Sequence, residues 1–396
     1  MANNNKHTGP NVPALRFPEF SGEWESIKLG DVLKLKGGYA FKSEKFQDSG
    51  VPVVRISNLP QNSYSVDLSD CVYYECGNYQ NYTVKNGDLL IAMSGATTGK
   101  TAIYRYDYPA YLNQRVGLFA PKELVHNQFL YPIVESKTFI SQLGSKLVAG
   151  AQPNISSQDI ETIAVGLPSK EEQIKIAHLF ELLNQKIETQ SKIIEELTTL
   201  RSALLEKVFQ VSNPTLEVGA IAHQTSERNK LCRYSNVLSV SNRFGFINQS
   251  EQFEDRNVAS DDVRNYKVVH RGDFAYNPAR INVGSIAMLK NFESGIVSPM
   301  YICFQVDDTI VDPSFFELFL ETKAFKDEME IRLEGSVRRC LSFEALCEIH
   351  LPHPALLVQR SISDKIGNIS SKIKLEDRIL RAYIRQKEWL LRQMFI

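Results

Sequence analysis

The sequence lacks the long apolar segments of membrane and secreted proteins. No run in its 396 residues approaches the ~20 consecutive apolar residues that a membrane span needs. Residues 1–10 are polar and contain no apolar run of signal-peptide length. We therefore expect a cytoplasmic protein with no membrane partner.

Cysteine is sparse, and its spacing argues against metal and disulfide frameworks. The six cysteines form no CxxC pair. His350 and His353 have no cysteine or carboxylate arrangement beside them that would complete a zinc site. We expect free thiols, with Cys340 and Cys347 in buried segments, and no bound metal.

An excess of positive charge is also missing, since 45 Lys and Arg stand against 46 Asp and Glu. The net charge therefore gives no argument for a polyanionic partner, and any nucleic-acid-binding face must be local. Candidate basic patches lie in both halves, at Lys34, Lys36, Lys42, Lys45, Arg264, Lys267, His270, Arg271, Arg332, Arg338 and Arg339.

What the sequence does contain is a duplication whose nearly constant period is close to half the length of the chain. Asn86-Gly87-Asp88 recurs as Arg271-Gly272-Asp273, and the pattern of residues 173–209 recurs in residues 359–395. A period this long indicates a duplicated domain, because solenoid repeats run about 20–50 residues. Duplicated domains suit a partner that is itself roughly two-fold symmetric, and double-stranded DNA is one such partner.

The pattern predicts an α+β fold in which each half is mixed and mostly β. Strand-forming residues at 51–56, 88–93 and 102–104 precede one helix near 127–147. The second half repeats this order from residue 216 to about residue 351. Each half ends at a Leu-Pro step, which suits the start of a helix.

A heptad pattern predicts one long helix after each half. The polar breaks Gln190 and Arg201 in the first seam fall at the same heptad positions as Glu376 and Lys387 in the second. The apolar seam residues, which we expect to pair the helices or to dock a partner, are Phe180, Leu183, Ile187, Ile194, Leu197, Leu204, Ile366, Ile369, Ile373, Leu380, Tyr383 and Leu390.

Loop length predicts the direction of the two helices. Five residues, 210–214, separate the first helix from the second half. They reach under ~18 Å, whereas a helix of about 40 residues is ~60 Å long. We therefore expect an antiparallel intramolecular coiled coil with one domain at each pole and internal two-fold pseudo-symmetry. One register pairs Gln190 with Lys387 and Arg201 with Glu376, and a slide by one heptad stays open.

The predicted division has four parts. Residues 1–168 form the first domain with its leader, 169–210 a central helix, 211–353 the second domain, and 354–396 a C-terminal helix.

Three motifs imitate catalytic or nucleotide-binding sites. Residues 95–101 are similar to a phosphate-binding loop, but the first glycine comes one residue late. Asn277-Pro278-Ala279-Arg280 is similar to the Asn-Pro-Pro-aromatic motif of adenine methyltransferases but lacks the ring that stacks on a flipped base. Asp312 with Glu321-Thr322-Lys323 is faintly similar to a nuclease triad, but its copy on the repeated helix favours a structural role. We expect no catalytic residue in this chain.

Further motifs follow one another in a fixed order along the chain. They lie at residues 12–20, Trp24, 29–31, 54–58, 86–90, 94–100, 113–115 and 150–156 in the first half, and at 238–241, 276–285, 297–301 and 335–342 in the second. Together with the duplication and the two in-register helices, they resemble the specificity subunits of type I restriction-modification systems. The resemblance covers residues 12 to 395 approximately.

This resemblance implies a DNA-recognition subunit without catalysis of its own. Each target-recognition domain would read one half of a split, non-palindromic site in double-stranded DNA. The helices would space the halves and dock two adenine methyltransferase subunits, and restriction (motor) subunits would join where the complex cleaves. No cofactor is expected on this chain, because S-adenosylmethionine, and ATP with Mg, belong to the partner subunits.

Side chains that read base edges are expected on loops rich in Arg, Lys, Asn and Gln, because these residues make paired hydrogen bonds to guanine or adenine. The alternative for each is a turn or a phosphate contact, since half or more of such hydrogen bonds go to phosphate and sugar. The candidates are Arg55, Asn58, Thr97, Thr98, Lys100, Asn113, Gln114, Arg115, Gln152 and Asn154 in the first domain, and Arg243, Arg280, Asn282, Ser298, Arg338 and Arg339 in the second.

Two other classes of function stay open at this point. One is a stand-alone methyltransferase or nuclease with degenerate motifs. The other is a scaffold whose duplicated domains bind protein instead of DNA.

Overall fold

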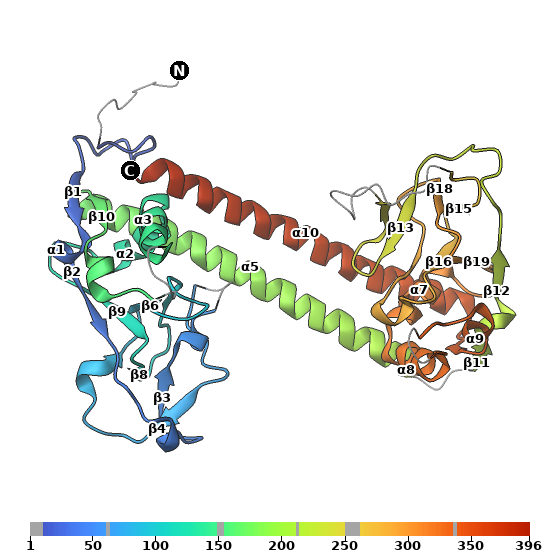
Figure 1. Ribbon diagram of the computed structural model, residues 1–396, viewed down its shortest axis with the longest axis horizontal. Helices are drawn as coiled ribbons and strands as arrows, with labels where there is room; N and C mark the ends of the chain where they lie inside the picture. The colour runs from blue at the N-terminus through green and yellow to red at the C-terminus, as the bar shows by residue number, and fades with distance from the viewer. Residues whose placement is uncertain (1–10, 61–63, 149–153, 211–213, 250–261, 336–338) are drawn as a thin grey trace. The chain divides into compact units, whose positions relative to one another are not determined.

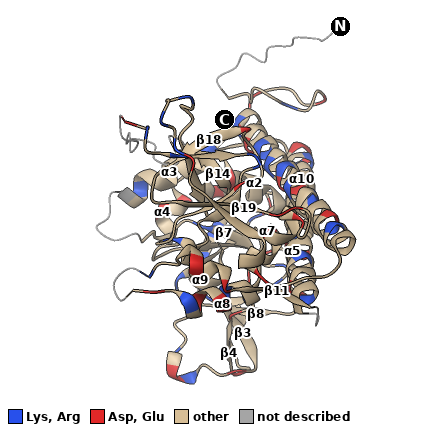
Figure 2. Ribbon diagram, turned by 90° about the vertical axis from the view of Figure 1, so that its right-hand side faces the viewer, with Lys and Arg blue, Asp and Glu red and all other residues tan. Residues whose placement is uncertain are grey.

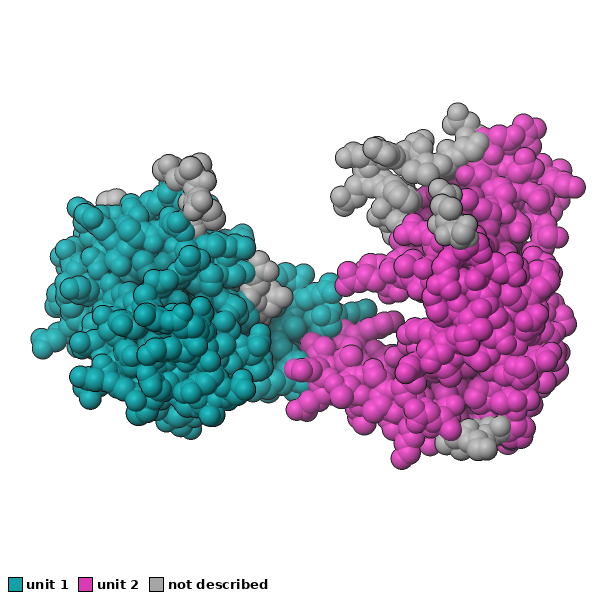
Figure 3. Space-filling model, turned by 60° about the horizontal axis from the view of Figure 1, so that its bottom comes forward, with its two compact units in different colours: residues 1–193, 376–396 teal, residues 194–375 magenta. Residues whose placement is uncertain are grey.

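A computed structural model of the chain describes residues 11–60, 64–148, 154–210, 214–249, 262–335 and 339–396. The chain forms two compact units, unit 1 from residues 1–193 and 376–396 and unit 2 from residues 194–375 (Figures 1 and 3). Each unit holds one globular domain and parts of both long helices. The four-part division predicted above treats each helix as a segment of its own, and it stays a prediction.

In its described residues, the domain of unit 1 contains two four-stranded sheets and one small strand pair. The sheet β2-β9-β6-β7 is antiparallel throughout, whereas the sheet β4-β3-β8-β5 joins β3 and β8 in parallel. The pair β1-β10 ties the start of the domain to its end. The elements are β1 (Glu25–Lys28), α1 (Leu29–Val32), β2 (Leu33–Gly37), β3 (Val51–Val54), β4 (Val72–Tyr74), β5 (Thr83–Val84), β6 (Leu89–Ala92), β7 (Thr101–Ile103), β8 (Ala110–Leu112), β9 (Val116–Pro121), α2 (Leu130–Glu135), α3 (Lys137–Val148), α4 (Ser157–Glu161) and β10 (Ala164–Leu167).

The domain of unit 2 is built around one four-stranded antiparallel sheet, β12-β19-β16-β17. A hairpin, β13-β14, and two pairs, β15-β18 and β11-β20, complete its strands within the described residues. The elements are β11 (Thr215–Glu217), β12 (Ala222–Thr225), β13 (Leu238–Ser241), β14 (Gly245–Asn248), β15 (Lys267–His270), β16 (Phe274–Tyr276), β17 (Ile286–Met288), β18 (Ser294–Val297), β19 (Ile302–Val306), α7 (Pro313–Glu321), α8 (Lys323–Arg332), α9 (Phe343–Cys347) and β20 (His350–Pro352).

The two antiparallel sheets confirm the duplication in their topology. The offset along the chain from β6 to β16 equals the offset from β7 to β17. In both sheets the first of these strands pairs with the second on one side and with β9 or β19 on the other. The turn that enters β7 or β17 contains a glycine with a positive φ in both units, +87° at Gly99 and +87° at Gly284. The prediction of two mixed, mostly β domains is therefore confirmed.

The single helix predicted near 127–147 is wrong in detail, because the chain breaks it at Ser136. Helix α2 ends at Glu135, and the Ser136 hydroxyl accepts a hydrogen bond from the backbone amide of Phe139 to cap α3. A serine that caps the next helix leaves the helical conformation itself. In unit 2, Thr322 separates α7 from α8 with the same bond to Phe325.

Both long helices are present, as predicted, and a buried glutamine fixes the start of each one to its domain. Helix α5 spans Lys170–Gln210 and helix α10 spans Leu356–Met394. Near the start of α5, the side chain of Gln173 donates to the carbonyl of Pro168 (2.9 Å) and accepts from the amide of His126 (2.8 Å). Gln359 makes the same two kinds of bond in unit 2, at 2.8 Å and 2.9 Å. The Leu-Pro steps therefore lead into anchored helix starts.

Within unit 1, the first part of α5 and the last part of α10 run antiparallel. The ring of Phe180 lies 6.0 Å from that of Phe395, and farther along the pair Gln190 donates to the carboxylate of Glu376. Leu183 joins one core cluster with Leu391 of α10. The predicted register that pairs Gln190 with Lys387 is therefore wrong.

Within unit 2, the last part of α5 and the first part of α10 also run antiparallel. Arg201 donates to the hydroxyl of Ser370 (2.7 Å), and Leu205 shares a core cluster with Ile366. The predicted pairing of Arg201 with Glu376 is also wrong, because the guanidinium of Arg201 binds Ser370 and the carboxylate of Glu321. The spacing of Arg201 and Ser370 agrees with the slide of about one heptad that the sequence left open.

The apolar seam shifts by one residue where each helix leaves its partner helix and packs on a domain. Leu204 is 36% exposed, whereas Leu205 is 4% exposed beside the domain of unit 2. In unit 1, Leu391 is more deeply buried than the seam residue Leu390. A continuous heptad pattern cannot predict this shift, because it assumes one partner along the whole helix.

In each unit, a cation of one long helix binds a glutamate of the domain, and the two glutamates occupy equivalent positions in the duplication. In unit 1 the ammonium of Lys387, on α10, lies 2.7 Å from Glu135 and 3.5 Å from the ring centre of Tyr64. In unit 2 the guanidinium of Arg201, on α5, donates twice to Glu321, at 2.8 Å and 2.9 Å. The two cations are separated along the chain by the same offset as the two glutamates, which makes this contact part of the duplication.

The thiols and the helices agree only partly with the sequence-based expectations. All six cysteines are free thiols, and Cys303 is buried, whereas Cys340 and Cys347 are only half-buried. Among the described residues, no helix combines the length and the apolar composition that crossing a bilayer requires.

Candidate nucleic-acid interface

Three segments of unit 1 meet beyond the ends of β6, β8 and β9. The backbone amide of Met93 donates to the carbonyl of Arg115 (2.9 Å), and that of Ile155 donates to the carbonyl of Met93 (2.9 Å). Ser94 and Asn154 form an antiparallel bridge. Because the main chains bind one another, the side chains of these segments remain available for a partner.

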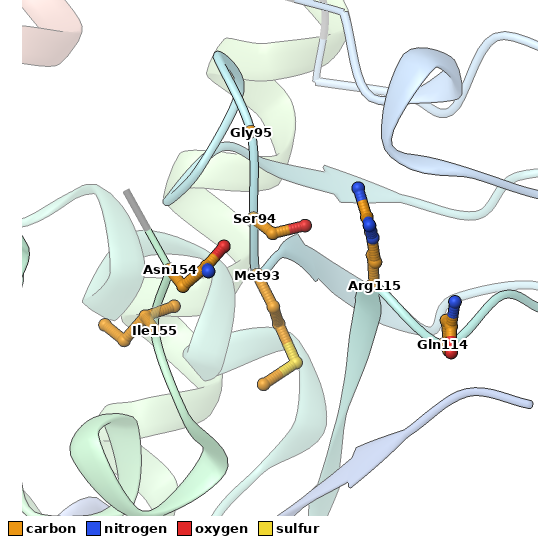
Figure 4. A pocket seen from close by; sticks show the side chains of 7 residues that line it. All are labelled: Met93, Ser94, Gly95, Gln114, Arg115, Asn154 and Ile155. Carbon is orange, nitrogen blue, oxygen red and sulfur yellow. The ribbon is translucent and has the colours of Figure 1, made fainter. Parts of the chain in front are cut away.

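The three segments surround an open hollow of about 520 Å³ (Figure 4). The exposed side chains of Gln114, Arg115 and Asn154 line it, and all three were predicted to contact DNA. The hydroxyl of Ser94, also at the hollow, is buried without a hydrogen-bond partner among the described residues. A concave site with amide, guanidinium and hydroxyl groups offers both donors and acceptors to a polar ligand.

The segment that imitates a phosphate-binding loop is a tight turn between β6 and β7. Gly95 and Gly99 have positive φ angles of +81° and +87°, and the Thr98 hydroxyl donates to the carbonyl of Gly95 (2.6 Å). Thr97 and Lys100 are half-buried in the same turn. The described chain continues from this turn into strand β7, whereas a nucleotide-binding loop of that kind leads into a helix. The turn therefore lies with Gln114, Arg115 and Asn154 on one edge of the domain, which we call the unit 1 edge.

Two of the predicted first-domain residues have structural contacts. Asn58 is 2% exposed, and its side chain accepts from the amide of Arg55 (2.9 Å) and donates to the carbonyl of Asp67 (2.9 Å). Arg55 is half-buried and reaches the carbonyl of Asp70 at 3.4 Å. Asn58 therefore shapes the loop from inside and presents no surface to a partner. Asn113 is half-buried beside the hollow, and Gln152 lies outside the described residues.

Sequence reasoning gave no particular weight to Tyr39, which lies next to the predicted residues. Its backbone accepts from the amide of Gln114 (2.9 Å), and its ring, 38% exposed, packs 5.0 Å from that of Phe41. The neighbouring Gly37-Gly38 step was the available signal. A Cβ on Gly38 would lie 2.2 Å from the carbonyl oxygen of Asn113, so only glycine permits this approach.

Unit 2 presents three turns, two of which lie at strand ends that correspond to those of unit 1. They are residues 241–245 between β13 and β14, residues 277–285 between β16 and β17, and residues 298–301 between β18 and β19. The Ser285 hydroxyl donates to the carbonyl of Val240 (3.0 Å), and the side-chain amide of Asn277 lies 3.7 Å from the sulfur of Met300. These contacts join the three turns into one edge, which we call the unit 2 edge.

The predicted second-domain residues fall mainly on this edge. Arg243, Arg280 and Asn282 are exposed there, and Ser298 is half-buried. Arg339 instead turns to α8 and forms an ion pair with Glu330. Arg338 lies outside the described residues.

Ion pairs neutralise most of the cations in the candidate basic patch of the second half. Arg264 pairs with Asp262 (2.9 Å), Arg271 with Glu293 (2.6 Å) and Arg332 with Glu328 (2.8 Å). Lys267 donates to the carbonyl of Tyr301 (2.7 Å). In the described part of unit 2, Arg243 and Arg280 are not in any such pair. They are therefore the cations of the unit 2 edge.

The remaining catalytic look-alikes have structural roles. The carboxylate of Asp312 caps α7 by accepting from the amide of Phe315 (2.9 Å), and Glu321 binds Arg201. Both carboxylates of this triad-like set therefore have structural partners. Among the described residues, no group of three or more His, Cys, Asp and Glu side chains is arranged to hold a metal ion.

Comparison with known proteins identifies the type of domain. Residues 21–199 match the family model of the type I restriction modification DNA specificity domain. The chain is 28% identical over 193 residues to the type I restriction enzyme MjaVIII specificity subunit of Methanocaldococcus jannaschii, covering 47% of this chain and 45% of that protein. It is 31% identical over 169 residues to the EcoAI specificity subunit of Escherichia coli, covering 40% and 28%. The chain thus spans less than half the length of these relatives.

Solved structures with this fold cover nearly the whole chain. The S subunit of a type I restriction-modification system from M. genitalium aligns with a TM-score of 0.62 at 15% identity, over 97% of this chain and 99% of that one. A chain from a study of complex assembly and conformational transition of the type I R-M system aligns with a TM-score of 0.51 at 15% identity, over 94% and 97%. At this identity the likeness shows the fold.

Proposed function

We propose that the chain is the DNA-recognition subunit of a type I restriction-modification complex and carries no catalytic residue. The match of residues 21–199 to the type I DNA specificity domain and the similarity to curated specificity subunits support this assignment. Each globular domain reads one half of a bipartite DNA site, and the halves differ because the domains differ in sequence. The long helices set the gap between the halves and dock two methyltransferase subunits, which hold S-adenosylmethionine. Restriction subunits, with ATP and Mg, join where the complex also cleaves. The proposal places the chain with its DNA in the cytoplasm.

The observation that supports this proposal is that both units expose a similar edge, formed by turns at the ends of strands. In both units, turns held by backbone or buried-serine hydrogen bonds display Arg, Asn, Gln or Thr side chains at the ends of corresponding strands. Such side chains match the donor and acceptor pattern of base edges in the major groove. Two edges of unlike sequence support two unlike half-sites.

Parts of both long helices remain exposed and could contact a partner protein. The seam residues Ile194, Leu197, Ile373, Leu380 and Tyr383 are only half-buried. Lys and Arg side chains also gather along α10, which has nine of them against four Asp and Glu (Figure 2). Partly covered apolar side chains beside a basic face suit contact with an acidic amphipathic surface of a methyltransferase subunit.

We expect that Arg280→Ala weakens DNA binding by about 1–3 kcal/mol and relaxes one position of one half-site. Its exposed guanidinium has no carboxylate partner in the described part of unit 2, so its loss removes a contact to DNA without unfolding the turn. Binding of the chain with its methyltransferase subunits to a library of sites measures both effects.

Two substitutions control this measurement. Arg115→Ala should relax a position of the other half-site, because Arg115 lies at the hollow of unit 1. Arg271→Ala should relax neither half, because Arg271 is paired with Glu293. If Arg280→Ala weakens binding equally on every sequence, Arg280 holds phosphate and does not read a base.

Mapping of methylated adenines tests the proposed function directly. Cells that express the methyltransferase subunits with this chain should methylate adenines in one bipartite motif, and cells without the chain should not. Purified chain with labelled methyl donor should transfer no methyl group. Methyl transfer by the chain alone would instead support a stand-alone enzyme. If the complex showed no salt-dependent binding to duplex DNA, the result would support a protein scaffold.

A further inference from the structure

The unit 2 edge displays large apolar side chains that a polar DNA-reading surface does not need. Phe244 is 67% exposed, Met300 63% and Val283 52%. Each comes from a different one of the three turns. Scattered exposed apolar residues are common, but three on adjoining turns form a patch, and such patches are typical of interaction sites.

The turns that carry these side chains are in contact. A Cβ on Gly284, next to Val283, would lie 3.3 Å from the Cβ of Asn242, near the tip of the β13-β14 hairpin. The amide of Asn277, at the start of the second turn, contacts the sulfur of Met300 at 3.7 Å. Phe244, Val283 and Met300 therefore belong to one continuous edge.

The charge of the edge indicates the class of partner. Residues 241–245, 277–285 and 297–301 contain Arg243 and Arg280 and not one Asp or Glu. The guanidinium of Arg243 lies 5.8 Å from the ring centre of Phe244, so cation and apolar group stand side by side. An apolar patch flanked by unpaired arginines and free of carboxylates is complementary to a polyanion with apolar groups exposed between its charges.

Unit 1 carries polar side chains at the positions that correspond to two of these three apolar residues. With the offset that relates β6 to β16, Val283 corresponds to Thr98 and Met300 to Arg115. Arg115 offers hydrogen-bond donors and the hydroxyl oxygen of Thr98 is a polar group, whereas Met300 and Val283 offer only apolar contact. The two edges therefore present chemically different side chains at these positions.

We infer that the unit 2 edge reads the 5-methyl group of thymine in the major groove, with Phe244, Val283 and Met300 as the contacting residues. The inference rests on the proposed function and adds to it the base chemistry of one half-site. Thymine carries the only apolar group that a base pair presents in the major groove of unmodified DNA, and apolar side chains are its usual partners. Arg243 and Arg280 bind the flanking phosphates or guanine edges.

Insertion of one side chain as a wedge between base pairs fits the patch less well. A wedge is typically a single protruding apolar residue in the minor groove, and it acts on stacking. Here three side chains from three turns form a broad surface with two cations beside it. That breadth suits contact with methyl groups along a groove.

The test replaces thymine by uracil, which removes only the methyl group. Once methylation mapping has given the site, each thymine of both halves is replaced singly, and binding of the complex with its methyltransferase subunits is measured. We expect at least one uracil in the half read by unit 2 to weaken binding about fourfold, the value for one buried methyl group. Uracil in the other half should change binding by about twofold or less, because Thr98 and Arg115 replace the apolar residues.

The variant Phe244→Ala should weaken binding to the thymine site about fivefold or more and remove the difference between thymine and uracil at one position. Leu231→Ala is the matched control, because Leu231 is similarly exposed in unit 2 but outside the three turns, and it should leave that difference unchanged. Circular dichroism of each variant checks its folding.

Two results would overturn the inference while leaving the proposed function intact. One is a site whose binding is insensitive to uracil in both halves. The other is a Phe244→Ala complex that loses the same affinity on thymine and uracil DNA, as a wedge would. Failure of the proposed function gives a different result, since the complex would then show no bipartite site to substitute.

Discussion

Lengthening both long helices by one heptad is expected to abolish methylation of the natural site, on the order of 100-fold or more, because the two halves can no longer be bound together. Insertions after Ile193 in α5 and after Leu375 in α10 fall where the two compact units divide these helices. Seven residues add about 10.5 Å to a helix, which corresponds to about three base pairs. The new motif should therefore keep both halves and have a gap about three base pairs longer.

Methylation mapping in cells that express the lengthened chain measures this shift. Each added base pair also turns one half around the duplex axis, so activity on the new motif should be below the natural level. A variant with seven conservative substitutions at the same positions controls for disturbance of the helices. An unchanged gap in the lengthened variant would refute the proposal that the helices set the spacing.

The substitution Lys387→Ala should lower the free energy of unfolding of unit 1 by about 3–5 kcal/mol, because it leaves a buried carboxylate without its cation. Lys387 is 3% exposed, and its ammonium lies 2.7 Å from Glu135. Burial raises the pKa of Glu135 against the pull of Lys387, and burial lowers the pKa of Lys387 against the pull of Glu135. In both groups burial disfavours the charged form, and the attraction of the partner offsets only part of this effect.

Tryptophan fluorescence during denaturant unfolding measures this loss in one unit. The chain has two tryptophans, Trp24 and Trp389, and both belong to unit 1. The double variant Glu135→Leu with Lys387→Met should recover most of the stability, because an apolar pair of similar volume replaces the ions. Arg201→Ala is the matched control from unit 2, and its unfolding is followed by circular dichroism because both tryptophans lie in unit 1. It should cost only about 1 kcal/mol or less, since its partner Glu321 is 45% exposed. Equal losses for Lys387→Ala and Arg201→Ala would contradict this account.

Sequence reasoning predicted the architecture because that information is periodic and duplicated. The heptads gave both long helices, and the nearly constant period of the duplication gave two related domains. It missed the break at Ser136, since a serine within an apolar pattern gives little sign of whether it caps a helix or sits inside one. The register was also wrong, because placing Gln190 opposite Lys387 ignored the competing glutamate Glu135 on the domain.

The candidate site was predicted less completely, because burial and pairing depend on contacts far apart in the sequence. Gln114, Arg115 and Asn154 do lie together at one hollow. Asn58 has the same chemistry but is enclosed by residues 55 and 67. Phe244, Val283 and Met300 drew no attention in the sequence, since isolated apolar residues in loops look like core until their exposure is known.

The closure of unit 1 around the end of α10 also constrains how the protein is made. The ring of Phe395 packs 5.9 Å from Trp24, 5.9 Å from Phe129 and 6.0 Å from Phe180, and a Cβ on Gly166 would lie 2.7 Å from Ile396. During translation these early residues leave the ribosome long before residues 376–396 do. The first domain to be synthesised is therefore completed last, and until then it exposes an apolar surface that chaperones would have to protect.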